Sequence, residues 1–222
     1  MNEWFRHAIK LIKSIRANIA MPWEKSFNEQ EVLDKAMDVF WQKGFDSTSI
    51  ADLIENTGLN RGSLYNAYGG KQQLFVKALL NYDQTRLQAL AGLEALDDPN
   101  KAISKFFDSN VSISVADPDL KGCFLFNTAL DVYAHDQQVN QIVTNGVAQI
   151  DAFLRRSIEV GQARGTIRAD LVAADTAKTL VALALAIRVL SRGVFNQEAL
   201  QTIADQAKRL ISIPTSTALE DQ

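Results

Sequence analysis

Several residue types are scarce in this sequence, and each scarcity excludes a class of protein. The 222 residues include one cysteine, so an intrachain disulfide framework is excluded and a reducing cytosol is the expected environment. The two histidines, His7 and His135, have no metal-ligand spacing, and no nucleophile–base or phosphate-loop pattern accompanies them. We therefore expect no enzyme, no metal and no cofactor.

Long apolar runs are also missing. No stretch of about 18 consecutive apolar residues occurs, which is the length that a membrane-spanning helix needs. No signal peptide is recognisable, so the sequence predicts a cytoplasmic protein without a membrane partner.

An excess of positive charge is absent as well. The net charge is −3, and residues 21–75 carry five basic and eight acidic side chains. This balance argues against a large non-specific surface for nucleic acid. Any contact with DNA must therefore come from a local patch, with the acidic side chains on the opposite face.

The residues that are present predict helices throughout and no strand. Apolar residues make up 47% of the chain and recur at helical spacing. Asn28 is the expected N-cap of the first of these helices, with Glu31 as its capping-box partner, and Gly44 ends it. Thr48 or Ser49 caps the next. The later helices are expected at about residues 60–66, 71–93, from 99, from 123, 137–163, 170–192 and 197–211.

Residues 48–75 carry the most informative pattern. Ile50, Leu53 and Ile54 lie on one helical face, Gly58 interrupts where a left-handed turn residue is needed, and Leu64 resumes the apolar face. Two short helices joined by a tight turn are typical of a helix-turn-helix, whose second helix enters the DNA major groove.

The details of this segment resemble the TetR family of bacterial transcriptional regulators. The similarity covers Asn28 to Phe75, about a quarter of the chain, and rests on these residues: Ala36, Phe40, Gly44, Phe45, Thr48, Ser49, Asn60, Arg61, Gly62, Ser63, Leu64, Tyr65, Tyr68, Lys71, Leu74 and Phe75. It implies an all-α fold of about nine helices, with a three-helix N-terminal helix-turn-helix DNA-binding domain and a larger helical ligand-binding and dimerisation domain. We place these domains at residues 25–72 and 73–213, with a flexible tail at 214–222.

The resemblance also implies DNA-contacting residues, which are Thr48, Ser49, Asn60, Arg61, Gly62, Ser63, Tyr65, Asn66 and Lys71. Arg61 can reach a guanine or a phosphate, while Tyr65, Lys71 and the Thr48 or Ser49 hydroxyl can bind phosphates. Tyr65 and Tyr68 could instead be core aromatics, and Lys71 a solvated lysine. Two positions depart from the family pattern: Ala67 removes a polar contact, and Gly70 replaces a serine-like helix cap.

In such a family the C-terminal region encloses a pocket for a small, mostly apolar effector. Candidate lining residues are Phe106, Phe107, Asn110, Phe124, Asn127, Thr128 and Phe153, although such stripes also occur as plain core. The last two helices are expected to form a homodimer interface that presents two reading helices to a palindromic operator. Its candidate residues are Leu180, Leu183, Ala184, Ile187, Leu190, Leu200, Ile203, Ala207 and Leu210.

Three questions stay open at the level of sequence. Cys123 opens an expected helix two residues after Lys121, which favours a thiolate and suggests a regulator controlled by oxidation or alkylation; the alternative is a buried structural thiol, since free cysteine is among the most buried residue types. Residues 1–24 form an N-terminal extension, which is either an amphipathic helix or the result of a long start-site assignment before Met21. An interaction or architectural protein that reuses the fold is the remaining alternative to a repressor.

Overall fold

The computed structural model describes residues 28–214. The expected N-terminal extension and the tail after residue 214 lie outside the described residues. Within them the chain forms only helices, as predicted, and none is both long and apolar enough to cross a membrane. The elements are α2 (Glu29–Lys43), α3 (Ile50–Thr57), α4 (Arg61–Tyr68), α5 (Lys71–Glu94), α6 (Pro99–Val115), α7 (Phe124–Leu130), the 3-10 turn η1 (Val132–Ala134), α8 (Gln137–Ala163), α9 (Ala173–Leu190) and α10 (Gln197–Ile211).

Side-chain caps explain where most of these helices begin. Asn28 caps α2, as expected, by accepting from the backbone N–H groups of residues 30 and 31. Glu31 was predicted to return a capping-box bond, but its carboxylate pairs with Lys35 Nζ at 2.7 Å instead. A reciprocal box does form at α3, where Ser49 and Asp52 each bond the other's backbone.

Glycines end α2 and α3, the two helices that precede α4. Gly44 follows α2 with φ 78°, and Gly58 follows α3 in the left-handed region with φ 75°, where a side chain would be strained. The sequence-based placement of both glycines is therefore confirmed.

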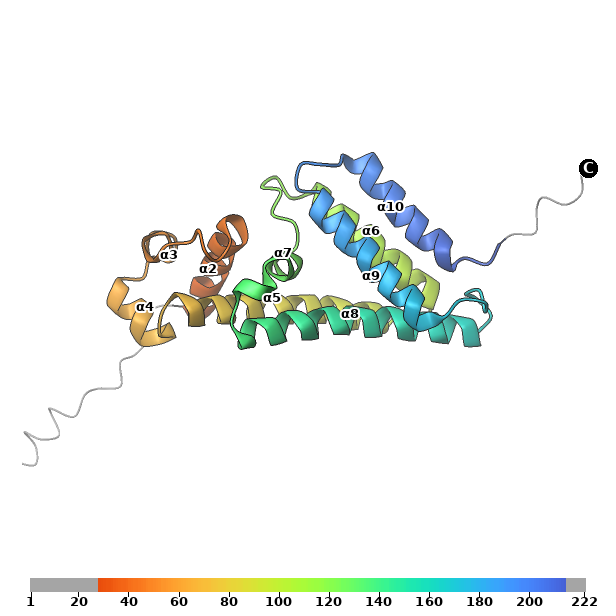
Figure 1. Cartoon of the computed structure of the whole chain (residues 1–222), viewed down its shortest axis with the longest axis horizontal. Helices are drawn as coiled ribbons and strands as arrows, with labels where there is room; N and C mark the ends of the chain where they lie inside the picture. The colour runs from red at the N-terminus through yellow and green to blue at the C-terminus, as the bar shows by residue number, and fades with distance from the viewer. Residues whose placement is uncertain (1–27, 215–222) are drawn as a thin grey trace, which may run out of the picture.

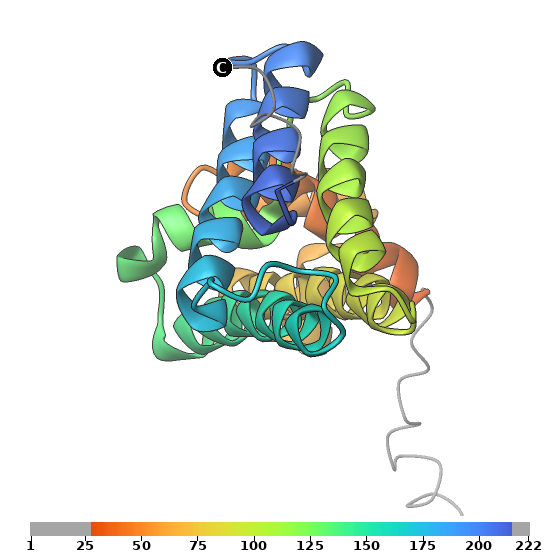
Figure 2. The same cartoon turned by 90° about the vertical axis from the view of Figure 1, so that its right-hand side faces the viewer.

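The helices form two regions along the long axis of the molecule (Figure 1). The N-terminal head consists of α2, α3 and α4, and it rests on the start of α5. The body consists of α5 to α10: the long helices α5 and α8 pack together, α6 and α9 pack across them, and α10 packs against α6 and α9 (Figure 2). Because α5 contacts both α2 and α8, it connects the head directly to the body.

Candidate nucleic-acid interface and ligand cavity

Helix α4 presents a polar outer face. Arg61, Gly62, Tyr65 and Asn66 are exposed and Ser63 is half-buried, whereas Leu64 and Tyr68 turn into the core. The guanidinium of Arg61 lies over the Tyr65 ring at 5.9 Å from its centroid. The structure therefore brings five of the predicted DNA-contacting residues onto one accessible surface, and Tyr68 is a core aromatic.

Asn60 and the residues at the start of α3 have structural roles. Asn60 Oδ1 accepts from the backbone N–H of Ser63 at 2.8 Å, so its carbonyl oxygen caps α4 rather than facing a base. Thr48 is 1% exposed and its hydroxyl donates to Gly44 O at 2.6 Å. Thr48 is thus turned away from any phosphate, while the Ser49 hydroxyl lies at the surface within its capping box.

Lys71 is committed to the protein backbone in this structure. Its Nζ donates to Phe45 O at 2.7 Å and to Thr48 O at 2.8 Å, and it lies 4.3 Å from the centroid of the Phe45 ring. The side chain therefore fastens the α2–α3 connection to the start of α5, and only the backbone at this helix start remains for a phosphate. Gly70 provides no side-chain cap, and its φ of 132° is a conformation reserved for glycine.

Trp41 of α2 links the head to the body. Its indole N–H donates to Lys121 O at 3.1 Å, and its ring lies 5.0 Å from Tyr82 of α5 and 6.1 Å from Phe124 of α7. The loop before α7 is therefore in direct contact with the helix that supports the turn motif.

The body encloses a cavity of about 320 Å³, at the small end of the roughly 300–1,000 Å³ range of ligand pockets. We call it the arginine cavity, because Arg86 of α5 and Arg188 of α9 both line it. Most of its wall is apolar, and Leu90, Phe126 and Ile150 contribute to it. Its exposed lining residues lie on α5 and α6 and mark the opening between these helices: Thr85, Ala89, Ser109 and Ile113.

The residues predicted to line a single effector pocket do not all lie around the same cavity. Phe106 and Asn110 line the arginine cavity, as does Cys123. Phe107 is fully buried core. Phe124, Asn127 and Thr128 instead border a smaller cavity of about 220 Å³ beside the head, and Phe153 borders a third cavity of about 420 Å³.

Arg86 and Arg188 were not identified from the sequence as cavity residues. Arg188 is 5% exposed, and its guanidinium donates to Ser114 Oγ at 2.9 Å and to Gly122 O. Arg86 pairs with Asp83 (2.6 Å) and donates to Gln149. The available signal was Arg188 itself, a single charge within the apolar stretch of residues 180–190.

Cys123 is a buried thiol in the wall of the arginine cavity. It is 6% exposed, and the Tyr82 hydroxyl donates to its sulfur at 3.2 Å. Burial, and then the neighbouring Cys123, raise the pKa of the Tyr82 phenol well above its ordinary value of 10.0. Tyr82 therefore remains a neutral donor at physiological pH. Lys121, predicted to favour the thiolate, lies instead 5.1 Å from the centroid of the Trp41 ring and pairs with Asp38.

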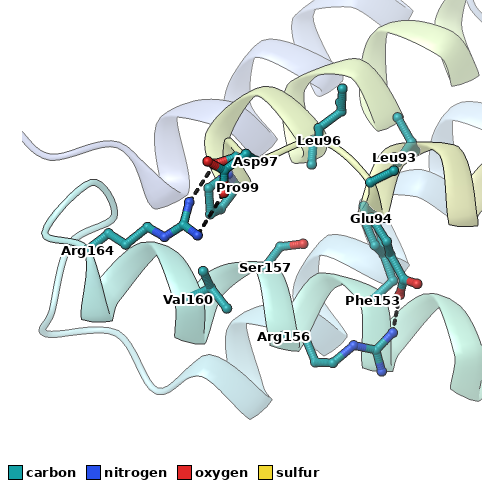
Figure 3. Close-up of a pocket in the computed structure, with 12 residues that line it drawn as sticks. Leu93, Glu94, Leu96, Asp97, Pro99, Phe153, Arg156, Ser157, Val160 and Arg164 are labelled. Atoms are coloured by element: carbon teal, nitrogen blue, oxygen red, sulfur yellow. Dashed lines mark hydrogen bonds and ion pairs between the residues drawn. The ribbon is translucent and has the colours of Figure 1, made fainter.

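The third cavity contains charged pairs. It lies between the loop after α5 and helix α8, and Figure 3 shows Arg156 pointing toward Glu94 and Arg164 toward Asp97. Arg164 Nη2 lies 2.9 Å from Asp97 Oδ1, and Arg156 is also within ion-pair distance of Glu94. We call this the paired cavity.

Five of the nine predicted dimer residues lie in the core of the chain itself. Leu180, Ala184, Ile187, Leu200 and Ala207 are each no more than 2% exposed. The strongest apolar stripes of α9 and α10 face α6 and α8, because a helix buries its most apolar side in its own chain first. Leu183, Leu190, Ile203 and Leu210 are half-buried at the edges of these stripes.

An exposed polar helix after a tight turn, carried on a helical body with an internal cavity, defines the class of helix-turn-helix DNA-binding regulators. The comparisons agree with this class. Residues 32–78 match the family described as bacterial regulatory proteins, tetR family, and residues 99–207 match the tetracyclin repressor-like C-terminal domain. The chain belongs to the TetR family, and the predicted family and fold class are confirmed.

Individual relatives extend over most of the chain. The uncharacterized HTH-type transcriptional regulator YezE of Bacillus subtilis (strain 168) is 33% identical over 147 residues, which is 64% of this chain and 75% of YezE. The HTH-type transcriptional repressor ComR of Escherichia coli (strain K12) is 27% identical, over 84% of this chain and 90% of ComR. A cysteine mutant of the TetR-family regulator CifR, solved with a 26-base-pair operator DNA, has a TM-score of 0.73 at 24% identity, over 84% of this chain and 98% of that chain.

Proposed function

We propose that this chain acts in the cytoplasm as a homodimeric repressor, released from a palindromic operator when a small, mostly apolar effector enters the arginine cavity. The observation that carries the proposal is the position of Trp41. This residue of the head lines the cavity of the body, so a ligand there touches the reading head directly.

The α4 surface supports the DNA-binding part. Arg61 and Asn66 are exposed and would reach base edges, Gly62 and Ser63 would let the backbone approach the groove, and Tyr65 would offer its hydroxyl to a phosphate. Because the head as a whole has an acidic excess, affinity depends on these few contacts more than on bulk charge.

The loop between α6 and α7 supports the release step. Arg188 donates to Gly122 O on the cavity side of this loop, and Trp41 donates to the adjacent Lys121 O on the head side. A ligand that displaces the loop would therefore shift α2 and change the spacing of the two reading helices of a dimer.

The dimer would use the outer side of α9. Thr179, Ala182, Ala186 and Val189 recur at helical spacing outside the core of the chain, and their small size permits close approach of a second helix. Val194 and Phe195 extend this side and are 66% and 42% exposed. A two-fold axis here would pair α9 and α10 with their counterparts in a second copy.

Modification of Cys123 is a second candidate for control, because the thiol lines the same cavity. A compound that enters the cavity could then act by alkylation instead of reversible binding. Cys123→Ser discriminates between the two: loss of the response supports alkylation, whereas an unchanged response supports reversible binding.

Selection of duplex DNA from a random pool by the purified chain tests the proposed function. We expect a palindromic motif, and an Arg61→Ala/Tyr65→Phe variant should bind it about tenfold or more weakly, because these groups contact DNA directly. Arg155→Ala, an exposed arginine on α8, is the matched control and should retain binding. The absence of any motif from folded, dimeric protein would contradict the proposal and favour an interaction protein.

A further inference from the structure

The arginine cavity has more positive than negative charge. Arg188 is almost completely buried, and it donates to neutral oxygens: Ser114 Oγ at 2.9 Å, Gly122 O, and Asn110 O at 3.5 Å. Within residues 28–214 it forms no ion pair. Burying a cation without a counterion is unfavourable, so the arginine is poorly matched to this site when the cavity is empty.

Arg86 adds to the imbalance. Asp83 neutralises its charge at 2.6 Å, but its Nη1 is buried and has no hydrogen-bond partner within residues 28–214. Among residues 28–214 no Asp or Glu lines the cavity, and of the two arginines only Arg86 has a carboxylate partner, Asp83. One positive charge and at least one N–H donor remain for a ligand.

The rest of the wall constrains the ligand in another way. Leu90, Phe126 and Ile150 provide an apolar surface opposite the charged groups, and the volume of about 320 Å³ admits only a small molecule. A planar guanidinium matches the two oxygens of a carboxylate better than it matches other groups of single charge.

We infer that the arginine cavity binds a small amphiphilic monoanion, whose carboxylate pairs with Arg188 and whose hydrocarbon body packs against the apolar wall. The inference rests on the proposed function, since it names the chemical class of the effector. It also gives the release step a cause: a carboxylate that engages Arg188 competes with Gly122 O and so loosens the loop that Trp41 holds.

Isothermal titration of the full chain tests this class directly. The probes are hexanoate, octanoate and phenylacetate, each compared with its own primary amide, which has nearly the same shape but no charge. We expect at least one acid to bind about tenfold or more tightly than its amide, because a charge-assisted bond replaces an unpaired cation. Equal binding of every acid and its amide, or no binding of any acid, would overturn the inference.

Two variants locate the charge. Arg188→Gln should remove most of the preference for the acid, and Arg86→Gln should reduce it. Arg156→Gln is the matched control, since Arg156 lines the paired cavity and has its own carboxylate partner. A preference that survives both cavity variants, or that Arg156→Gln removes, would show that the anion binds elsewhere.

A second measurement on the unchanged protein guards against misfolded variants. Cys123 is the only cysteine of the chain and lines the arginine cavity, so its reaction with N-ethylmaleimide reports on occupancy. The acid that binds best should slow this reaction severalfold, and its amide should not. Binding of the acid without protection of the thiol would contradict the site.

Operator affinity is measured separately with the selected DNA. Charge-dependent binding and thiol protection without any change in operator affinity would support the anion site and contradict effector-controlled release. Release by an uncharged compound, with no preference for acids, would overturn the anion site and leave the proposed function intact.

Discussion

The arginine cavity and the paired cavity lie side by side in the same helical body and share Leu93, yet they treat charge in opposite ways. In the paired cavity the charged side chains remain largely exposed, and each arginine has its own carboxylate (Figure 3). In the arginine cavity the guanidinium groups are buried, and only Arg86 has a carboxylate partner.

This difference is the reason for proposing the arginine cavity, and not the paired cavity, as the ligand site. In an exposed ion pair each charge neutralises the other and water screens both. The described residues of the paired cavity therefore leave no unpaired charge that a ligand could neutralise. A buried cation with only neutral partners lacks a counterion, which a ligand could provide, and the wall around this cation is mostly apolar. Volume does not make this distinction, because the paired cavity is the larger of the two, at about 420 Å³ against 320 Å³.

The largest effect on stability is expected at the buried pair. Arg86→Met leaves the Asp83 carboxylate, whose side chain is 12% exposed, without its partner, and should lower the free energy of unfolding by about 3 kcal/mol. Urea denaturation followed by circular dichroism measures the loss. The double variant Asp83→Asn/Arg86→Met should recover most of it, and a double variant as unstable as the single one would refute the assignment to an unpaired charge.

The second-largest effect on stability is expected in the loop before α7, which contacts Arg188. Gly122 has φ 71°, and a Cβ there would lie 2.7 Å from the backbone oxygen of Arg188. Gly122→Ala should therefore lower the free energy of unfolding by about 2 kcal/mol through strain and overpacking, and it should weaken the binding of acids.

Gly92→Ala is the matched control for this variant. Gly92 lies within α5 with nothing near its Cβ position, so alanine there should stabilise the fold by about 0.5–1 kcal/mol. Equal effects of the two substitutions in urea denaturation would show that the loop is not tightly constrained.

Local features of the fold could be predicted from sequence because they depend on neighbouring residues. Asn28, Gly44 and Gly58 were placed correctly, since a cap or a left-handed turn residue acts within a few positions. Whether Thr48 or Ser49 is the N-cap of α3 could not be predicted from the sequence. Both can cap a helix, and only the packing of the head buries Thr48 and leaves Ser49 for the cap.

The cavity and the dimer surface depend on tertiary contacts, so the sequence predicted them less well. The apolar stripes of α9 and α10 were assigned to a partner subunit, but a stripe does not say which surface it covers. Phe106 and Phe153 looked equivalent in the sequence, and the fold places them in different cavities. The absence of an ion pair at Arg188 within the described part of the chain becomes visible only when the fold brings α6 and the loop before α7 against it with neutral partners.

The smallest effect on the free energy of unfolding is expected in the paired cavity. Arg156→Met and Arg164→Met remove pairs whose side chains are 42–96% exposed, and each should cost less than about 1 kcal/mol in urea denaturation. The loss should shrink further in high salt, because solvent ions screen exposed charges. A cost as large as that of Arg86→Met would mean that burial is not what distinguishes the two cavities, and the reason for preferring the arginine cavity as the ligand site would then be lost.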